Sequence, residues 1–172
     1  MQLPAVGRGD GKIDPIDKKR AEIYEKLRAC GQPAVFALAK ALSDPDVQLR
    51  RNAALVLIDL PGRYSRGSHP KVDTRPAMPA LIKATSDLDG DVRAWAAHAL
   101  AEIGPDAKVA IPDLIRLLKD PMEGPRNTSC IALGRIGPAA KTAIPALQEA
   151  LNDPSKDVRQ FARDAIGNIQ QK

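Results

Sequence analysis

The sequence repeats itself at an interval of 33 residues. Arg93, Arg126 and Arg159 follow one another at that spacing, and each lies near the start of a short segment rich in small apolar residues. A related segment surrounds Arg50. A fixed interval of this size indicates units that stack in line, because one unit cannot bury its apolar face alone. Such proteins present extended surfaces, so the repeat also constrains the function.

Composition favours a stack of thin helices. The chain has 172 residues, of which 44% are hydrophobic but only 3% aromatic. Helices that pack through alanine, leucine, isoleucine and valine need few rings. The 15 prolines suit many short helices, because proline is well tolerated in a helical first turn. The predicted fold class is therefore all-α.

Each unit is predicted to be a pair of helices that an aspartate separates. The aspartates are equivalent in register, as are the apolar residues that close the second helices: Asp44, Asp87, Asp120 and Asp153, and Leu60, Ile103, Ile136 and Ile169. The predicted repeats span residues 33–61, 76–104, 109–137 and 142–170, joined by short links such as 104–109. The first step is 43 residues, which places a ten-residue insertion in a loop at 61–76.

The N-terminal part is predicted to precede the repeats. Residues 1–12 contain glycine, proline and mixed charge and are expected to be flexible, while 13–172 form one domain. Asp14 and Pro15 resemble a helix start. We expect a capping helix over 14–29, because the end of a stack needs a polar cover.

The repeated pattern a-I-P-x-L-x-x-x-L-x-D-x-x-x-x-V-R-x-x-A-x-x-A-L-x-x-I-G resembles the HEAT repeat, in particular the HEAT-like repeats of phycobilisome lyases. The resemblance implies a right-handed α-solenoid, an armadillo-type superhelix, of about four HEAT-like helix pairs plus an N-terminal capping helix. It also implies a ladder between neighbouring repeats, built from an aspartate and the arginine six residues later. The matching pairs are Asp44/Arg50, Asp87/Arg93, Asp120/Arg126 and Asp153/Arg159.

The residues do not favour an enzyme. No Walker loop, GxSxG or HExxH motif occurs, and with only His69 and His98 a multi-histidine metal site is not expected. No cofactor is expected, and no specific residue supports phycobilin lyase or DNA glycosylase chemistry. Neither a signal peptide nor an apolar run of about 18 residues is present, so no membrane span is expected and the cytoplasm is the predicted location.

The main functional prediction is a protein-interaction scaffold. In HEAT stacks the second helix of each pair lines the concave face, where a partner peptide or helix would bind. Trp95 is the natural anchor, since tryptophan is enriched at binding hot spots, although it could instead only pack between helices. The other candidates are His98, Arg51, Asn127, Arg135, Arg163 and Phe161.

A nucleic-acid-binding solenoid is the alternative. The chain carries a net charge of +5, and a nucleic acid would be bound by the basic 61–76 loop together with arginines of the concave face. Four residues of the loop could contact phosphates or stack on a base: Arg63, Tyr64, Arg66 and Lys71. A surface loop without a binding role explains the same residues. The chain is expected to be a monomer, or a weak end-to-end dimer if apolar residues of the last helix, such as Ile166, are left uncovered.

Overall fold

The computed structural model describes residues 26–27, 29–60 and 72–171. Within these residues every regular element is helical, so the predicted all-α class is confirmed. The first helices of the pairs are α2 (Gln32–Ala41), α4 (Met78–Ala84), α6 (Ile111–Leu117) and α8 (Ile144–Ala150). The second helices are α3 (Val47–Asp59), α5 (Gly90–Ile103), α7 (Glu123–Ile136) and α9 (Lys156–Gln170).

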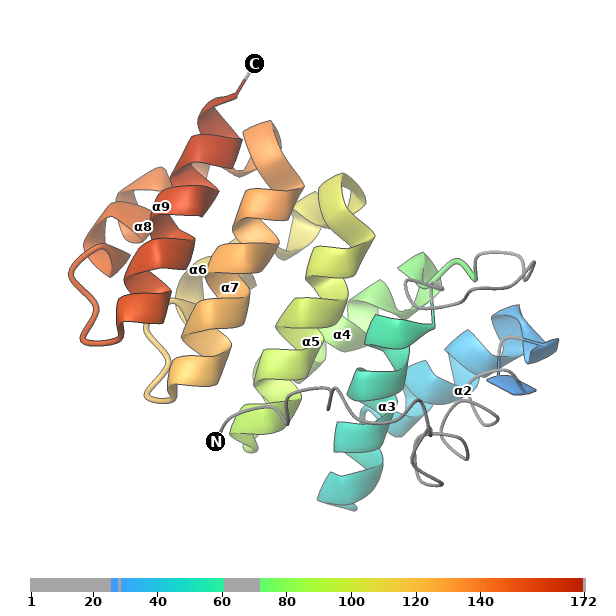
Figure 1. Ribbon diagram of the computed structural model, residues 1–172. Coiled ribbons are helices and arrows are strands. Elements are labelled where there is room, and N and C mark those ends of the chain that lie inside the picture. The colour runs from blue at the N-terminus through green and yellow to red at the C-terminus, as the bar shows by residue number, and fades with distance from the viewer. Residues whose placement is uncertain (1–25, 28, 61–71, 172) are drawn as a thin grey trace, which may run out of the picture.

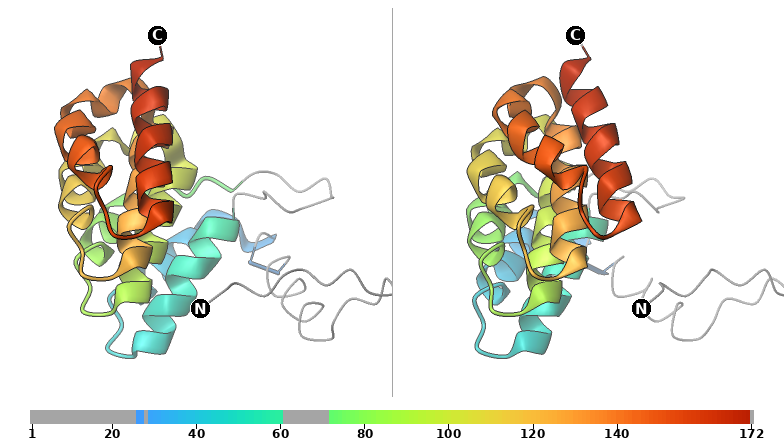
Figure 2. Two further views of the ribbon diagram at one scale, coloured as in Figure 1. Left: turned by 60° about the vertical axis from the view of Figure 1, so that its left-hand side comes forward. Right: turned by 90° about the vertical axis from the view of Figure 1, so that its left-hand side faces the viewer.

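The helices form two layers of a solenoid. In Figure 1 the second helices α3, α5, α7 and α9 lie side by side, with the first helices behind them. Figure 2 shows the same two layers from the C-terminal end. The expected capping helix over 14–29 falls mostly outside the described residues, where only 26–27 and 29–30 are seen to be helical.

Three of the second helices, α3, α5 and α9, begin at a side chain that caps them, and two, α5 and α7, end at a glycine. Asp46, Asp89 and Ser155 act as N-caps, and each side chain accepts a hydrogen bond from a backbone N–H of the first turn. Gly104 and Gly137 follow α5 and α7 with φ of 69° and 72°, a backbone conformation that glycine adopts without strain. Local capping groups thus set these helix ends.

The predicted links between later repeats are themselves helical. Short 3₁₀ helices precede the first helices α4, α6 and α8: η1 (Arg75–Ala77), η2 (Gly104–Ala110) and η3 (Gly137–Ala143). Their small residues Ala107, Ala110, Ala140 and Ala143 are fully buried. The link is therefore part of the packed core and not an irregular loop. Of the predicted insertion, 61–71 lies outside the described residues, while Val72 and Thr74 are buried.

The repeats pack closely because the facing side chains are small. The residue four positions after the repeated arginine is Ala54, Ala97 or Cys130 in the first three repeats, and each is 0% exposed. Burial raises the pKa of the Cys130 thiol to about 12, so this cysteine acts as a small apolar side chain. Gly134 allows α7 to approach α9 closely: a Cβ there would lie 3.0 Å from the Ala165 Cα.

Two equivalent glycines should therefore respond to alanine in opposite ways. At Gly167, one repeat after Gly134, a Cβ would meet nothing within 4 Å. We expect Gly134→Ala to lower the free energy of unfolding by about 1–3 kcal/mol through overpacking. Gly167→Ala should raise it by about 0.5–1 kcal/mol, because glycine is a poor helix former. Urea unfolding measures both, and shifts of the same sign would contradict the close α7–α9 contact.

Candidate interaction surface

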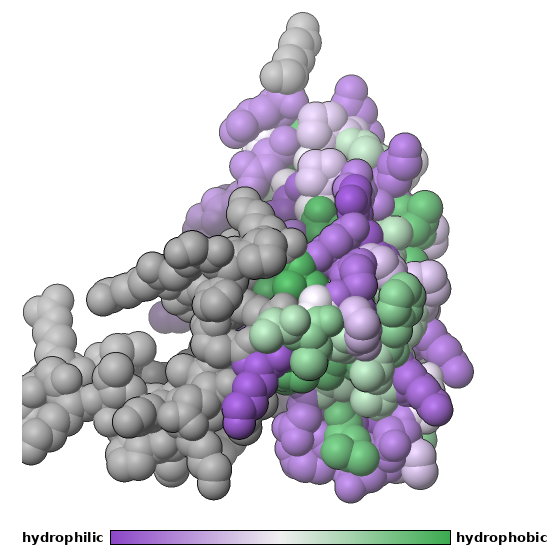
Figure 3. Space-filling view, turned by 90° about the vertical axis from the view of Figure 1, so that its right-hand side faces the viewer, coloured by the Kyte–Doolittle hydropathy of each residue, from purple (hydrophilic) through white to green (hydrophobic). Residues whose placement is uncertain are grey.

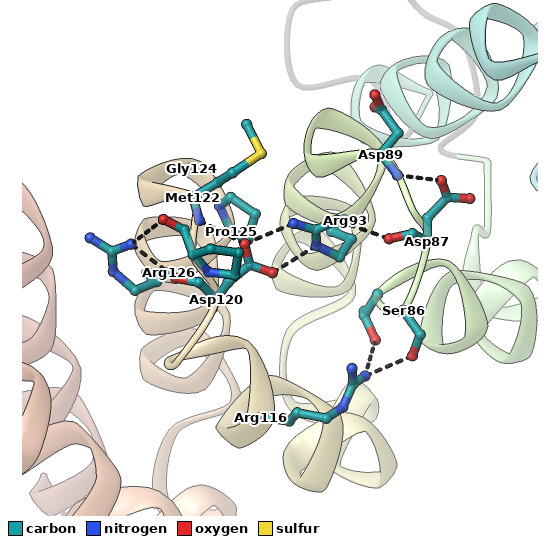
Figure 4. Close-up of polar contacts among 12 residues, drawn as sticks. Ser86, Asp87, Asp89, Arg93, Arg116, Asp120, Met122, Gly124, Pro125 and Arg126 are labelled. Atoms are coloured by element: carbon teal, nitrogen blue, oxygen red, sulfur yellow. Dashed lines mark hydrogen bonds and ion pairs between the residues drawn. The ribbon is translucent and has the colours of Figure 1, made fainter.

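A ladder of arginine–aspartate pairs joins the repeats at the turns between first and second helices (Figure 4). The Nε and Nη2 atoms of Arg93 donate to the two carboxylate oxygens of Asp120 in the next repeat, at 2.6 and 2.8 Å. Its Nη1 donates to the carbonyl oxygens of Asp87 and Leu88 in its own turn. Each arginine thus fixes its own turn and orients the following repeat through a planar two-bond contact.

The same geometry recurs along the stack. Arg50 donates to the carboxylate of Asp87 at 2.7 and 3.0 Å, and Arg126 to that of Asp153 at 2.7 and 2.9 Å. The pairs lie between repeats, while the aspartate six residues before each arginine offers its backbone carbonyl. Arg159, in the last repeat, donates only to the carbonyls of Asp153 and Pro154 among the described residues.

Within the ladder, the pKa values of Asp120 and Asp153 are lowered. Burial alone would raise the pKa of Asp120, but the hydrogen bonds from Arg93 and from the Met122 N–H outweigh it and hold the pKa below its usual value. The hydrogen bond from Arg126 likewise lowers the pKa of Asp153, and that from Arg51 lowers the pKa of Asp89. The folded chain therefore favours ionised aspartates.

These shifts predict a loss of stability in acid. A carboxyl group whose pKa is lower in the folded state stabilises the fold above its unfolded pKa of about 3.9. That stability is lost as the pH falls through the folded pKa. We expect the ladder's contribution to be constant from neutral pH down to about 5 and to decline below about 4. Thermal melts across this range test it. Asp120→Asn should flatten the acid decline, and an unchanged decline would contradict the assignment.

The accessible surface of the second helices lies apart from the ladder. We call it the second-helix face and define it by the residues two, five and nine positions after each repeated arginine. They are Asn52, Leu55, Asp59, Trp95, His98, Glu102, Thr128, Ile131, Arg135, Phe161, Asp164 and Asn168. All of them are partly or fully exposed, whereas the positions three, six, seven and ten after the arginine are mostly buried. These residues lie on the second helices, which the HEAT resemblance predicts to line the concave surface.

Apolar side chains follow the second-helix face from repeat to repeat. Trp95 is half-buried and packs against the core while part of it stays accessible to solvent. Ile131 and Phe161 are also half-buried and line a pocket of about 270 Å³ between α7 and α9. Arg135, Asp164 and Asn168 complete its rim. An apolar floor with a polar rim suits a side chain of a protein partner.

Two predicted polar candidates, Arg135 on this face and Arg51 beside it, are held by neighbouring carboxylates. Arg51 donates to both oxygens of Asp89, at 2.6 and 3.0 Å, and so contributes to inter-repeat contact. Arg135 donates to Oε1 of Glu102, which also lies 3.4 Å from Nε2 of His98. These carboxylates offset the positive charge that the two arginines would offer to an anionic partner.

The remaining candidates divide into two groups. Asn127 donates to Glu123 at 3.3 Å, and its Oδ1 is buried without a hydrogen-bond partner in the described part of the chain. Arg63, Tyr64, Arg66 and Lys71 lie outside the described residues. Three further residues that line the pocket, Ile131, Asp164 and Asn168, are not among the predicted candidates, because the pocket depends on how α7 and α9 pack.

Two further properties concern the described residues only. They contain no cluster of three or more histidine, cysteine or acidic side chains that could hold a metal ion. None of their helices has the length and apolar character needed to cross a membrane.

The sequence profile of the HEAT repeats matches residues 78–167 of the chain, which is more than half of its length. The chain belongs to the HEAT-repeat family. No curated protein sequence matches it.

Solved structures show the same HEAT-type architecture. The complex of CpcE and CpcF of phycocyanin lyase from Nostoc sp. PCC7120 is 28% identical over 98% of this chain and 71% of that chain, with a TM-score of 0.70. An engineered protein is 25% identical over 86% and 67% of the two chains, with a TM-score of 0.65. A designed armadillo repeat protein in complex with the peptide (KR)4 shares only 18% identity over 88% and 74%, at a TM-score of 0.65, and so shows the fold alone.

Proposed function

We propose that this HEAT-repeat protein is a non-enzymatic scaffold that binds a peptide or helix of a protein partner on its second-helix face. Solenoids of this kind are typical of protein-interaction scaffolds. The observation that carries the proposal is the row of half-buried apolar side chains Trp95, Ile131 and Phe161 on successive second helices, with a pocket beside the last two. Each gives a partner an anchor that is already partly ordered by packing.

A nucleic-acid partner is the competing outcome. Its affinity would fall steeply with salt, since each neutralised phosphate releases counterions. Arg51 and Arg135 are engaged by Asp89 and Glu102, which favours the protein partner on this face. Binding of a protein partner and binding of a nucleic acid differ in how they depend on salt, on nuclease treatment and on Trp95.

Affinity capture with the purified chain separates these outcomes. The immobilised wild type, Trp95→Ala and Leu88→Ala are exposed to native lysate, with and without nuclease, at low and high salt. Leu88 is 98% exposed in the turn between α4 and α5 and serves as an apolar control away from the face. A protein retained through nuclease and high salt, and lost only with Trp95→Ala, supports the proposal. Nucleic acid that is released by salt and retained by Trp95→Ala would overturn it.

A further inference from the structure

The C-terminal end of the solenoid is closed by polar residues. Four positions after the repeated arginine, where the inner repeats have alanine or cysteine, α9 carries the exposed Arg163. Gln160 and Gly167, which flank Arg163 on the same side of α9, are exposed as well, and Arg163 donates to Gln160 at 3.0 Å. A further repeat could stack here only by burying a cation, which is costly without a paired carboxylate.

The N-terminal end has the opposite character. Leu49 is 48% exposed, whereas the equivalent residues Val92 and Val158 are 0% exposed. Val92 and Val158 each follow a complete preceding helix pair, whereas only residues 26–27 and 29–31 of the described part precede α2. Figure 3 faces this end and shows apolar side chains at the surface among polar ones.

Asp44 adds a specific polar group to this end. Its Oδ1 accepts from the Asp46 N–H at 2.9 Å, just as the Asp87 Oδ1 accepts from the Asp89 N–H at 2.9 Å. Its carbonyl accepts from Arg50 Nη1, as in the inner repeats. The carboxylate is therefore held in the ladder geometry, yet within the described ranges no guanidinium donates to it. By contrast, the carboxylates of Asp87, Asp120 and Asp153 each accept two hydrogen bonds from one guanidinium, a contact that we call the fork.

We propose that the N-terminal end of the solenoid docks the C-terminal end of another helical-repeat chain. The partner's last helix supplies an arginine to the Asp44 carboxylate and small side chains against α3, which reproduces an internal junction. Two observations favour such a partner: the charge of an arginine complements that of Asp44, and the equivalent carboxylates of the three later repeats each bind an arginine. The surface is separate from the second-helix face, so the two proposals stand or fall independently.

Arg163 is expected to prevent the chain from docking onto a second copy of itself. Its own C-terminal end offers Arg159, whose Nη1 is held by its turn at 2.6 and 2.9 Å in the manner of the inner arginines. The nearby Arg163, however, occupies the position that must be small for stacking. A head-to-tail contact of this kind does not close on itself and would generate fibres, so a blocking charge protects the free chain.

The experiment changes α9 so that the C-terminal end of one copy of the chain can bind the N-terminal end of another copy. Gln160→Asn with Arg163→Ala gives α9 the pattern that α7 presents to its neighbour, namely asparagine, a small residue and glycine. Both replaced side chains are exposed, so folding is expected to be retained, and circular dichroism checks this. In sedimentation velocity the wild type should remain one species, while the double variant should show a sedimentation coefficient that rises with concentration. Adding Asp44→Asn should weaken this association by about tenfold or more, because the fork loses its acceptor.

Two results would overturn the proposal. One is a double variant that stays monomeric at the highest attainable concentration, which would show that these ends do not fit. The other is self-association that persists with Asp44→Asn, which would place the contact elsewhere. Arg163→Lys keeps the blocking charge and should stay monomeric, and Trp95→Ala in the double variant should leave the association unchanged.

Discussion

Replacing Arg93 by alanine should lower the free energy of unfolding by about 2–4 kcal/mol, because a half-buried carboxylate loses both of its charged donors. The side chains of Arg93 and Asp120 are only 12% and 7% exposed, so water can replace the guanidinium only in part. Arg93→Lys should recover little, since an ammonium group cannot supply the planar fork. Urea unfolding monitored by circular dichroism measures each difference.

Two matched variants identify the source of that loss. Lys119 and Glu149 also form an ion pair between neighbouring repeats, but their side chains are 71% and 66% exposed. Lys119→Ala should therefore cost less than about 1 kcal/mol. Arg159→Ala removes only the bonds to the carbonyls of its own turn and should cost less than Arg93→Ala. Equal losses for Arg93 and Arg159 would mean that the contact between repeats adds nothing.

The period of the sequence was enough to predict most of the fold. Asp87 and Arg93 recur with their neighbours in one register, and a helix pair with an aspartate at its turn follows from that pattern. The family resemblance supplied the idea that the pairs connect neighbouring repeats. The structure adds the detail that an arginine binds the carboxylate of the following repeat and the carbonyl of its own aspartate.

The linking segments were harder to predict. Residues 104–109 look like a loop, because Gly104 and Pro105 are common in turns. In the structure they belong to η2, whose buried alanines pack into the core. Burial of such short elements depends on the repeats on either side, which a single repeat sequence does not reveal.

The candidate surface was predictable as a stripe but not as a pocket. The spacing of Trp95, Thr128 and Phe161 places them on one face of successive helices. The depth of Trp95 and the hollow beside Phe161 depend on lateral packing between helices, such as the approach of Gly134 to Ala165. Likewise, the sequence marks Arg51 as a possible ligand, and only the fold shows it committed to Asp89.

Loss of the apolar anchors should be the largest effect on binding. Trp95→Ala and Phe161→Ala are each expected to weaken binding of the captured partner by about 30-fold or more, which corresponds to the 2 kcal/mol typical of a hot spot. Trp95→Phe should keep the packing against the core and lose less. Leu88→Ala should bind as the wild type does. Thermal melts of each variant show whether the fold is retained.

The most direct test is the dissociation constant of the captured partner for the wild type, Trp95→Ala, Phe161→Ala and Leu88→Ala, measured by calorimetry on chains that melt normally. Binding that is lost with Trp95→Ala and unchanged with Leu88→Ala is the result expected if the second-helix face receives the partner. Unchanged binding by Trp95→Ala and Phe161→Ala would contradict the proposed function, even with the ladder and the fold intact.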